Sequence, residues 1–479
     1  MSQSSAQSRD PRALFRLEPE LLYHRGCLRP GLGVCVDSEG SVLLIEPMER
    51  PFDGLSIPLP RRALFPGFVN AHSHAFQRLI RYQTHEVPAE RPRSDFWSWR
   101  RAMYDAALRL TPEDFKAVTA RCYLDMLKAG ITAVAEFHYV HHDRDGAPYA
   151  DRNLLASKVI EAAEEVGIRV CVVPVAYHLS GFNRPALPEH RRFVSRNVDA
   201  FIRQVQDLRA AVGSLKNPSV GVGVAAHSVR AVPGTWLRRL KALADAEGIP
   251  LHIHASEQKG EVEACLEATG MRPVQWLETH GFLGEGTTIV HATHLHTREK
   301  IALGRAGVTI CVCPTTERDL GDGLVDARGL LERGALLALG SDSHVVIDFF
   351  EEMRCLEGHE RLRTRRRNVL VAPREAEHER ADTLSVTPTL WSAATQGGSR
   401  ALFMPLGCLE PGCRADAFTI DLDACELDGV SPREVDTALW LSGSYSWVRD
   451  VFVGGKRVIE AGRHPREDAI RAAFRALYR

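Results

Sequence analysis

Four short segments of the chain carry side chains that can hold a metal ion. The first, NAHSHAFQR, places His72 and His74 one residue apart after the apolar run FPGFV. Side chains two residues apart on a strand point to the same face, so both imidazoles can face one site. An isolated H-x-H pair is explained about equally well as a polar strand end whose histidines bond to backbone. The pair therefore needs partners from elsewhere in the chain.

Such partners follow three later apolar runs. LHIHASE carries His254 and, three residues further on, Glu257; VHATH carries His291, and LGSDSH carries Asp342. Three imidazoles and one carboxylate suit Zn²⁺ and leave a position for water. We therefore predict one zinc ion per chain. His252 shares a face with His254 but lies deeper in the strand, and we interpret it as a core or supporting histidine.

The elements that position these residues follow an alternating pattern. Eight apolar runs with little internal alternation, as expected of parallel strands buried on both faces, are separated by helical patterns such as DFKAVTARCYLDMLKAG. This order predicts an α/β fold, a (β/α)₈ TIM-like barrel. A doubly wound sheet is disfavoured because polar residues end at least six of the runs, as the active-site end of a barrel requires. The runs are ALFPGFVNAHSH, ITAVAEFHYV, RVCVVPVAYH, VGVGVAAHS, PLHIHASE, TTIVHATH, VTICVCPTT and LLALGSDSH.

The two ends of the chain have a different pattern. Residues 21–60 contain short strand-like pieces separated by Gly and Ser turns, and DAFTIDLD, TALWLSG and VRDVFVGGKRVIEAG after residue 406 also predict strand and turn. We expect a small β-sandwich domain built from both termini. Its two parts are residues 1–62 and 405–479, and the metal-dependent barrel occupies residues 63–404.

Composition narrows the class of protein. Hydrophobic residues make up 44% and charged residues 25% of the chain, which is ordinary for a soluble protein. A formal net charge of -1 gives no electrostatic case for a nucleic-acid or membrane partner. The N-terminal segment MSQSSAQSRDPR has no apolar signal core, and eleven scattered cysteines argue against a disulfide framework. We expect a cytoplasmic enzyme with a small-molecule substrate.

Taken together, these motifs resemble the amidohydrolase superfamily. The resemblance rests on H-x-H in the first run, histidines in the fifth and sixth, an aspartate in the eighth, and PLGCLEPGCRADAFTID near the end. The longer motifs DFWSWRRAMY, MLKAGITAVAEFHYVHHD, HSVRAV and ERDLGDG are similar to superfamily deiminases that act on formimidoyl-L-glutamate in histidine degradation. This similarity covers nearly the whole chain.

The resemblance implies specific roles. It makes His72, His74, His254 and Asp342 metal ligands, and Glu257, His291 and Asp342 the catalytic groups around a metal-activated water. It also implies a homodimer that releases ammonia and N-formyl-L-glutamate. Five further side chains would surround the substrate, and these are Gln77, Arg100, Tyr139, His227 and Arg230.

Two arginines suit a substrate with two carboxylates, because a guanidinium binds a carboxylate through a planar, two-pronged contact. Several of these residues also have an alternative interpretation in which they do not bind the substrate. Arg100 follows two tryptophans and can be a surface arginine stacked on one of them. Tyr139 can be a core aromatic residue, and Gln77 can only open a helix.

Other functions remain open alternatives. A mononuclear superfamily deaminase acting on a purine or pterin ring would need stacking and amide groups in place of the arginines. A non-catalytic metal-binding protein is disfavoured because Glu257, His291 and Asp342 are all present. A binuclear site with a carboxylated lysine is disfavoured because VGVGVAAHSVR ends without lysine. Arg318 and the segment at residues 81–93 look distinctive and would affect access to the site.

Overall fold

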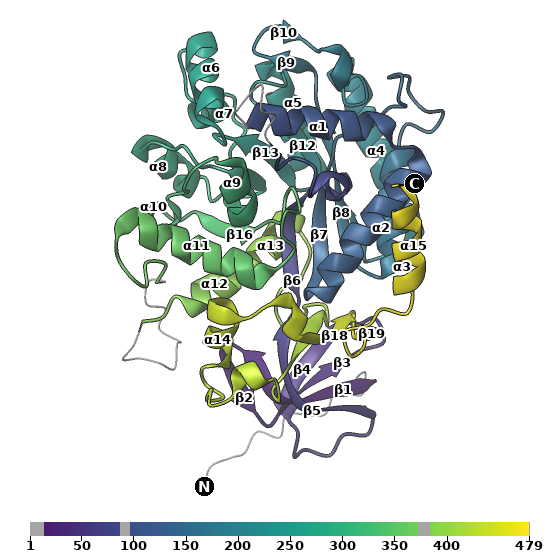
Figure 1. The fold of residues 1–479 in the computed structure, drawn as a ribbon, viewed down its shortest axis with the longest axis vertical. Coiled ribbons are helices and arrows are strands. Elements are labelled where there is room, and N and C mark those ends of the chain that lie inside the picture. The colour runs from purple at the N-terminus through teal and green to yellow at the C-terminus, as the bar shows by residue number, and fades with distance from the viewer. Residues whose placement is uncertain (1–13, 87–95, 372–383, 479) are drawn as a thin grey trace.

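The computed structural model describes residues 14–86, 96–371 and 384–478, which form a barrel and a β-rich unit below it (Figure 1). Eight parallel strands of the described chain pair in the order β16-β15-β14-β13-β12-β8-β7-β6. A bridge between Ser73 and Asp342 joins the last strand to the first. The predicted (β/α)₈ barrel is therefore confirmed.

The barrel strands coincide with the apolar runs. Every residue of β7 and β8 is buried, which explains why these runs lack an alternating polar face. Strand β11 (Val220–Val222) pairs with β8 just before β12 begins. The eight strands are β6 (Phe68–Ser73), β7 (Ile131–His138), β8 (Arg169–Ala176), β12 (Val224–Ser228), β13 (Leu251–Ala255), β14 (Thr287–His291), β15 (Thr309–Val312) and β16 (Leu336–Leu339).

Helices connect the strands, and α2 illustrates how the sequence sets their limits. Thr111 and Asp114 form a reciprocal capping box at its start, and Gly130 follows its end with φ of 80°. The helices are α1 (Phe96–Arg109), α2 (Pro112–Lys128), α3 (Leu154–Val166), α4 (Val198–Leu215), α5 (Gly234–Glu247), α6 (Lys259–Thr269), α7 (Pro273–Thr279), α8 (Thr297–Arg305), α9 (Pro314–Leu320), α10 (Ala327–Leu331), α11 (Phe349–Thr364), α12 (Thr387–Ala394) and α13 (Gln396–Leu402). Short loop elements are η1 (Ala75–Ile80), η2 (Pro188–His190), β9 (Leu179–Gly181) and β10 (Arg184–Pro185).

Both ends of the chain join in one sheet, so the predicted β-rich unit from the two termini is confirmed. Its order is β19-β18-β17-β5-β1-β3-β4, with β2 beside β1. N-terminal β5 pairs antiparallel with C-terminal β17 and leads directly into barrel strand β6. The proposed domain limits at 62/63 and 404/405 stay a prediction. The strands are β1 (Phe15–His24), β2 (Cys27–Pro30), β3 (Leu32–Val36), β4 (Val42–Pro47), β5 (Leu55–Pro66), β17 (Ala417–Asp421), β18 (Val448–Val453) and β19 (Lys456–Ile459).

The prediction of strand and turn for TALWLSG is wrong, because this segment lies in helix α14 (Val435–Ser442). Val435, Leu439 and Trp440 are buried, a spacing that puts them on one helix face. Short apolar runs do not separate strand from helix by themselves. The C-terminal helix α15 (Glu467–Ala476) lies beside α2 (Figure 1), where Lys128 pairs with Glu467 at 2.9 Å. Short 3₁₀ helices η3 (Cys425–Leu427) and η4 (Tyr445–Trp447) complete the C-terminal part.

Two further observations concern the cysteines and the membrane-crossing potential of the helices. One disulfide joins Cys408 and Cys413, five residues apart, and nine cysteines are free. Among the described residues, no helix combines the length and the apolar character that crossing a membrane requires.

Candidate active site

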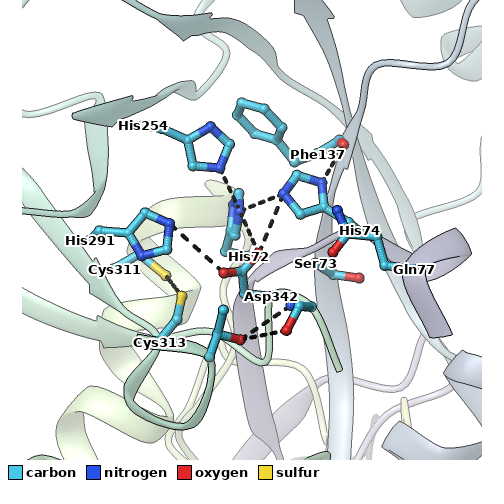
Figure 2. Close-up of polar contacts among 12 residues, drawn as sticks. His72, Ser73, His74, Gln77, Phe137, His254, His291, Cys311, Cys313 and Asp342 are labelled. Carbon is cyan, nitrogen blue, oxygen red and sulfur yellow. Dashed lines mark hydrogen bonds and ion pairs between the residues drawn. The ribbon is translucent and has the colours of Figure 1, made fainter. Parts of the chain in front are cut away.

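Four predicted metal ligands meet at the carboxyl ends of the barrel strands (Figure 2). Nε2 of His72 lies 3.1 Å from Nε2 of His74 and 3.0 Å from Nε2 of His254. Oδ1 of Asp342 lies 3.5 Å from Nε2 of His72 and 3.4 Å from Nε2 of His74. The structure thus brings together side chains from β6, β13 and the loop after β16.

The donor set fits a divalent cation. Nδ1 of His74 lies 3.2 Å from the Phe137 carbonyl oxygen, and Nδ1 of His254 lies 2.9 Å from the His227 carbonyl oxygen. A ring whose Nδ1–H donates to a carbonyl presents a lone pair at Nε2. Burial lowers the pKa of His72 and His254 and lowers that of His74 to about 3, so the rings are neutral. Lone pairs that converge at this separation repel one another, and a bound Zn²⁺ ion would relieve that repulsion.

Backbone geometry holds Asp342 against the first strand. Asp342 has φ of 44° and His291 has φ of 71°, both in the left-handed region that residues other than glycine rarely adopt. The amide of Asp342 donates to the His72 carbonyl at 3.0 Å, and the amide of His74 donates back to Asp342 at 3.2 Å. A Cβ at Gly340 would lie 2.9 Å from Cβ of His72, so this close approach requires glycine. The two hydrogen bonds hold Asp342 in this conformation against the end of β6.

Proton-transfer groups lie beside the ligand cluster. Nε2 of His291 lies 3.7 Å from Oε1 of Glu257 and 3.8 Å from Oδ2 of Asp342. Burial acts to lower the pKa of His291, but Glu257, Glu317 and Asp342 hold it well above its usual value. Burial raises the pKa of Glu257 to about 7. The ring of His291 is therefore a proton donor, and Glu257 can give or accept a proton near neutral pH.

Two of the predicted substrate residues touch each other beside the metal ligands. Nε2 of Gln77 donates to the Tyr139 hydroxyl at 2.9 Å. The Tyr139 ring centre lies 5.0 Å from that of His74. Gln77 lies in the short helix η1 and contacts Tyr139, and its role toward the substrate stays a prediction.

Two further predicted substrate residues are arginines. Arg100 is buried, not a surface residue, and its Nη2 donates to the Tyr177 hydroxyl at 2.9 Å. Burial lowers the pKa of Arg230, and the positive charge of Arg100 lowers it further. The His227 ring centre lies 4.7 Å from that of Tyr177 and 5.2 Å from that of His254. The arginines therefore lie on the side of the site that His227 connects to the metal ligands.

Three buried acids take part in this network that the sequence did not single out. Glu136 on β7 accepts from Oγ of Ser73 at 2.6 Å and from the amide of Ala75 at 2.7 Å. Oε1 of Glu317 lies 3.3 Å from Nδ1 of His291. Asp322 lies beside Glu257 and His291. All three belong to motifs that the resemblance uses, EFHY and ERDLGDG, but their partners come from other strands and are therefore not visible in the local pattern.

Three histidines without an assigned role lie against backbone carbonyl groups. The ring nitrogens of His141, His142 and His294 lie 2.9, 3.0 and 2.8 Å from carbonyl oxygens. His252 is a core histidine, as predicted, with Nε2 2.8 Å from the Ala401 carbonyl. Arg318 pairs with Glu351 of α11 at 3.0 Å. Residues 87–93 of the distinctive 81–93 segment lie outside the described residues.

Comparisons with a protein family, a curated protein and solved structures each find similar proteins. The sequence profile of the Amidohydrolase family matches residues 63–458. A formimidoylglutamate deiminase of Pseudomonas aeruginosa is 40% identical over 419 residues, which cover 86% of this chain and 88% of that protein. The crystal structure of an amidohydrolase from Brucella melitensis is 32% identical, with a TM-score of 0.85 over 97% of this chain and 98% of that one. An adenosine deaminase from Xanthomonas campestris with bound zinc shares the fold at 23% identity, with a TM-score of 0.80 and coverage of 97% and 98%.

Proposed function

Because this chain belongs to the amidohydrolase family, we propose that it is a zinc-dependent deiminase of N-formimidoyl-L-glutamate. The products are N-formyl-L-glutamate and ammonia. The observation that carries the proposal is the presence of two arginines on the side of the site that His227 connects to the metal ligands: Arg100, which donates to the Tyr177 hydroxyl, and Arg230, three residues after His227. A substrate with one hydrolysable C–N bond and two carboxylates matches both parts of this site.

The metal would be held by His72, His74, His254 and Asp342. When bound there, Zn²⁺ lowers the pKa of a water ligand from about 15.7 toward about 7. The neighbouring groups of the chain then direct the proton of that water. Oδ2 of Asp342 faces Nε2 of His291 at 3.8 Å, so it is the oxygen placed to accept the proton. Burial acts to raise the pKa of Asp342, but its contacts with His72 and the other rings hold it below the usual range.

Glu257 and His291 complete the reaction at the amidine carbon. Glu257, with its pKa raised to about 7 by burial, delivers a proton to the departing nitrogen so that ammonia leaves. His291 donates from Nε2 to the oxygen on which negative charge develops. Because Nδ1 of His291 lies against Glu317, the ring keeps Nε2 turned toward Glu257 and Asp342.

We assign the substrate's carboxylates to the side of the site that holds Arg100 and Arg230. Arg100 and Arg230 supply the guanidinium groups, and His227, Gln77 and Tyr139 supply further polar groups between them and the metal ligands. Because the charge of Arg100 lowers the pKa of Arg230, a bound carboxylate would stabilise the charged form of Arg230. A substrate with two carboxylates therefore suits this part of the site.

A deaminase of a purine-like ring is the alternative on this scaffold. Such a ring is neutral and offers Arg100 and Arg230 no carboxylate to bind. Ammonia release from zinc-loaded protein, compared between N-formimidoyl-L-glutamate and adenosine, separates the two. We expect turnover of the first and none of the second. Turnover of adenosine alone would assign the site to ring deamination.

We further propose that the protein acts in histidine degradation as a cytoplasmic homodimer with one zinc ion per chain. Light scattering of the purified protein tests the dimer. Metal analysis by mass spectrometry tests the zinc, and a value near one zinc per chain is expected.

A further inference from the structure

Asp322 is a buried acid in the loop after α9, with 4% of its surface exposed. Its Oδ1 accepts a hydrogen bond from Nε2 of Gln258, whereas its buried Oδ2 has no hydrogen-bond partner among the described residues. One oxygen of Asp322, one oxygen of Glu257 and one ring nitrogen of His291 all lie within 4.8 Å of one another. A carboxylate oxygen of Asp322 thus lies beside Glu257 and His291.

A buried carboxylate oxygen without a donor is costly, because it has lost the water that solvated it. Here the cost is increased by a second carboxyl nearby. Burial and the adjacent Glu257 raise the pKa of Asp322 to about 9, although His291 opposes the shift, so a further bound cation would favour the ionised form of Asp322. This end of the site therefore favours a ligand that brings positive charge and N–H donors.

The proposed substrate carries such a group. An amidine is a strong base and is a cation at neutral pH, and its terminal nitrogen bears two N–H groups that point in different directions. If one of them faces Glu257, which must exchange a proton with this nitrogen, the second is free for another acceptor. Asp322 lies beside Glu257 and offers that acceptor.

We propose that Asp322 is a substrate-positioning residue whose Oδ2 accepts a hydrogen bond from the terminal nitrogen of an amidinium cation bound beside Glu257 and His291. The inference rests on the proposed function and adds a residue that recognises the departing group. After hydrolysis an oxygen replaces that nitrogen, and a formyl oxygen has no proton to donate. Asp322 therefore binds the amidinium cation of the substrate more strongly than the neutral formyl group of the product.

The test compares substrate with product in the zinc-loaded, full-length protein. Asp322→Asn keeps the shape and an oxygen that accepts from Gln258, but removes the negative charge. We expect kcat/KM for N-formimidoyl-L-glutamate to fall about ten- to hundredfold, the loss typical of a charge-assisted hydrogen bond. The inhibition constant of N-formyl-L-glutamate should change less than about threefold or tighten. Asp319→Asn, on α9 and paired at 3.6 Å with His85, is the matched control and should leave both values unchanged.

Equal losses for substrate and product in Asp322→Asn would overturn the proposal, since a purely structural role weakens both. Unchanged values would overturn it as well. If the Asn variant does not fold, Asp322→Ser provides the same comparison. Failure of the proposed function is recognised separately, because the wild-type protein would then release no ammonia. In that case calorimetric binding of formamidinium to wild type and Asp322→Asn still tests Asp322, with weaker binding to the variant expected and equal binding contradicting the proposal.

Discussion

Oε1 of Glu317 lies 3.3 Å from Nδ1 of His291, and the same oxygen accepts the backbone amide of Cys313 at 2.9 Å. Both side chains are buried, and the carboxylate reaches the ring from the first turns of α9. The contact fixes which ring nitrogen of His291 faces the site. Oε1 of Glu317 therefore connects the segment after β15, the seventh barrel strand, to His291 at the end of β14, the sixth.

Glu317→Gln should lower kcat because the amide can accept from the Cys313 backbone but carries no charge to stabilise a protonated ring. We expect kcat to fall roughly ten- to hundredfold, with KM changed less than about threefold, since Glu317 does not touch the substrate. Steady-state kinetics of ammonia release measure both values. The exposed Glu332→Gln serves as control. A variant with wild-type kcat would show that the orientation of His291 does not depend on this carboxylate.

Arg230→Met should chiefly raise KM. The methionine keeps part of the apolar volume but cannot bind a carboxylate, and this contact is made in the ground state and transition state alike. A rise of about ten- to hundredfold is expected, as for other charge-assisted contacts. Arg239→Met, at the surface where Arg239 pairs with Asp199, is the matched control. An unchanged KM would remove Arg230 from the substrate site.

Asp342→Asn should abolish most turnover, because the amide is a poorer metal ligand and a poor proton acceptor. A loss of at least about a thousandfold in kcat is expected for a group with both tasks. Zinc content, measured by mass spectrometry after dialysis, should also fall below that of the wild type. Full zinc content together with full activity would contradict both proposed roles of Asp342.

Glu136 makes the free energy of unfolding depend on pH. Burial raises its pKa from 4.5 to about 7, although the hydrogen bonds from Ser73, Ala75 and Tyr123 oppose the shift. A carboxyl whose pKa is higher in the folded state holds its proton more tightly there. The stability it contributes is full below about pH 4.5 and is lost as the pH rises toward 7, by up to about 3 kcal/mol.

Glu136→Gln removes this ionisation and should reduce the loss of stability between pH 5 and pH 7.5 relative to wild type. Urea unfolding of both zinc-loaded proteins at the two pH values measures the difference. The exposed Glu263→Gln should follow the wild-type pH dependence. Parallel pH profiles for wild type and Glu136→Gln would mean that Glu136 does not titrate in this range.

Much of the barrel was predictable because strands buried on both faces leave continuous apolar runs in the sequence. The same logic located His72, His74 and Asp342 at strand ends, and the structure brings them within contact distance. TALWLSG shows the limit of this approach. Its residues form a helix whose Trp440 donates to Thr387 at 2.9 Å, a partner 53 positions away that no local pattern reveals.

Glu317 and Asp322 show why the supporting groups of the site were harder to predict. An acid in a glycine-containing loop is usually solvated, and ERDLGDG gives no sign of burial. Each becomes part of the site only because α9 follows β15 and turns its side chains toward His291 and Glu257. Such contacts depend on how neighbouring strands are aligned, which the spacing of residues within one segment does not determine.

Hydrolysis of N-formimidoyl-L-glutamate in ¹⁸O-labelled water tests the central claim most directly. Attack of water on the formimidoyl carbon, with loss of the terminal nitrogen, predicts equal amounts of ammonia and N-formyl-L-glutamate. Mass spectrometry should find one ¹⁸O atom in the formyl group of that product. Formation of formamide and free glutamate, or the absence of any ammonia from the zinc-loaded protein, would contradict the account.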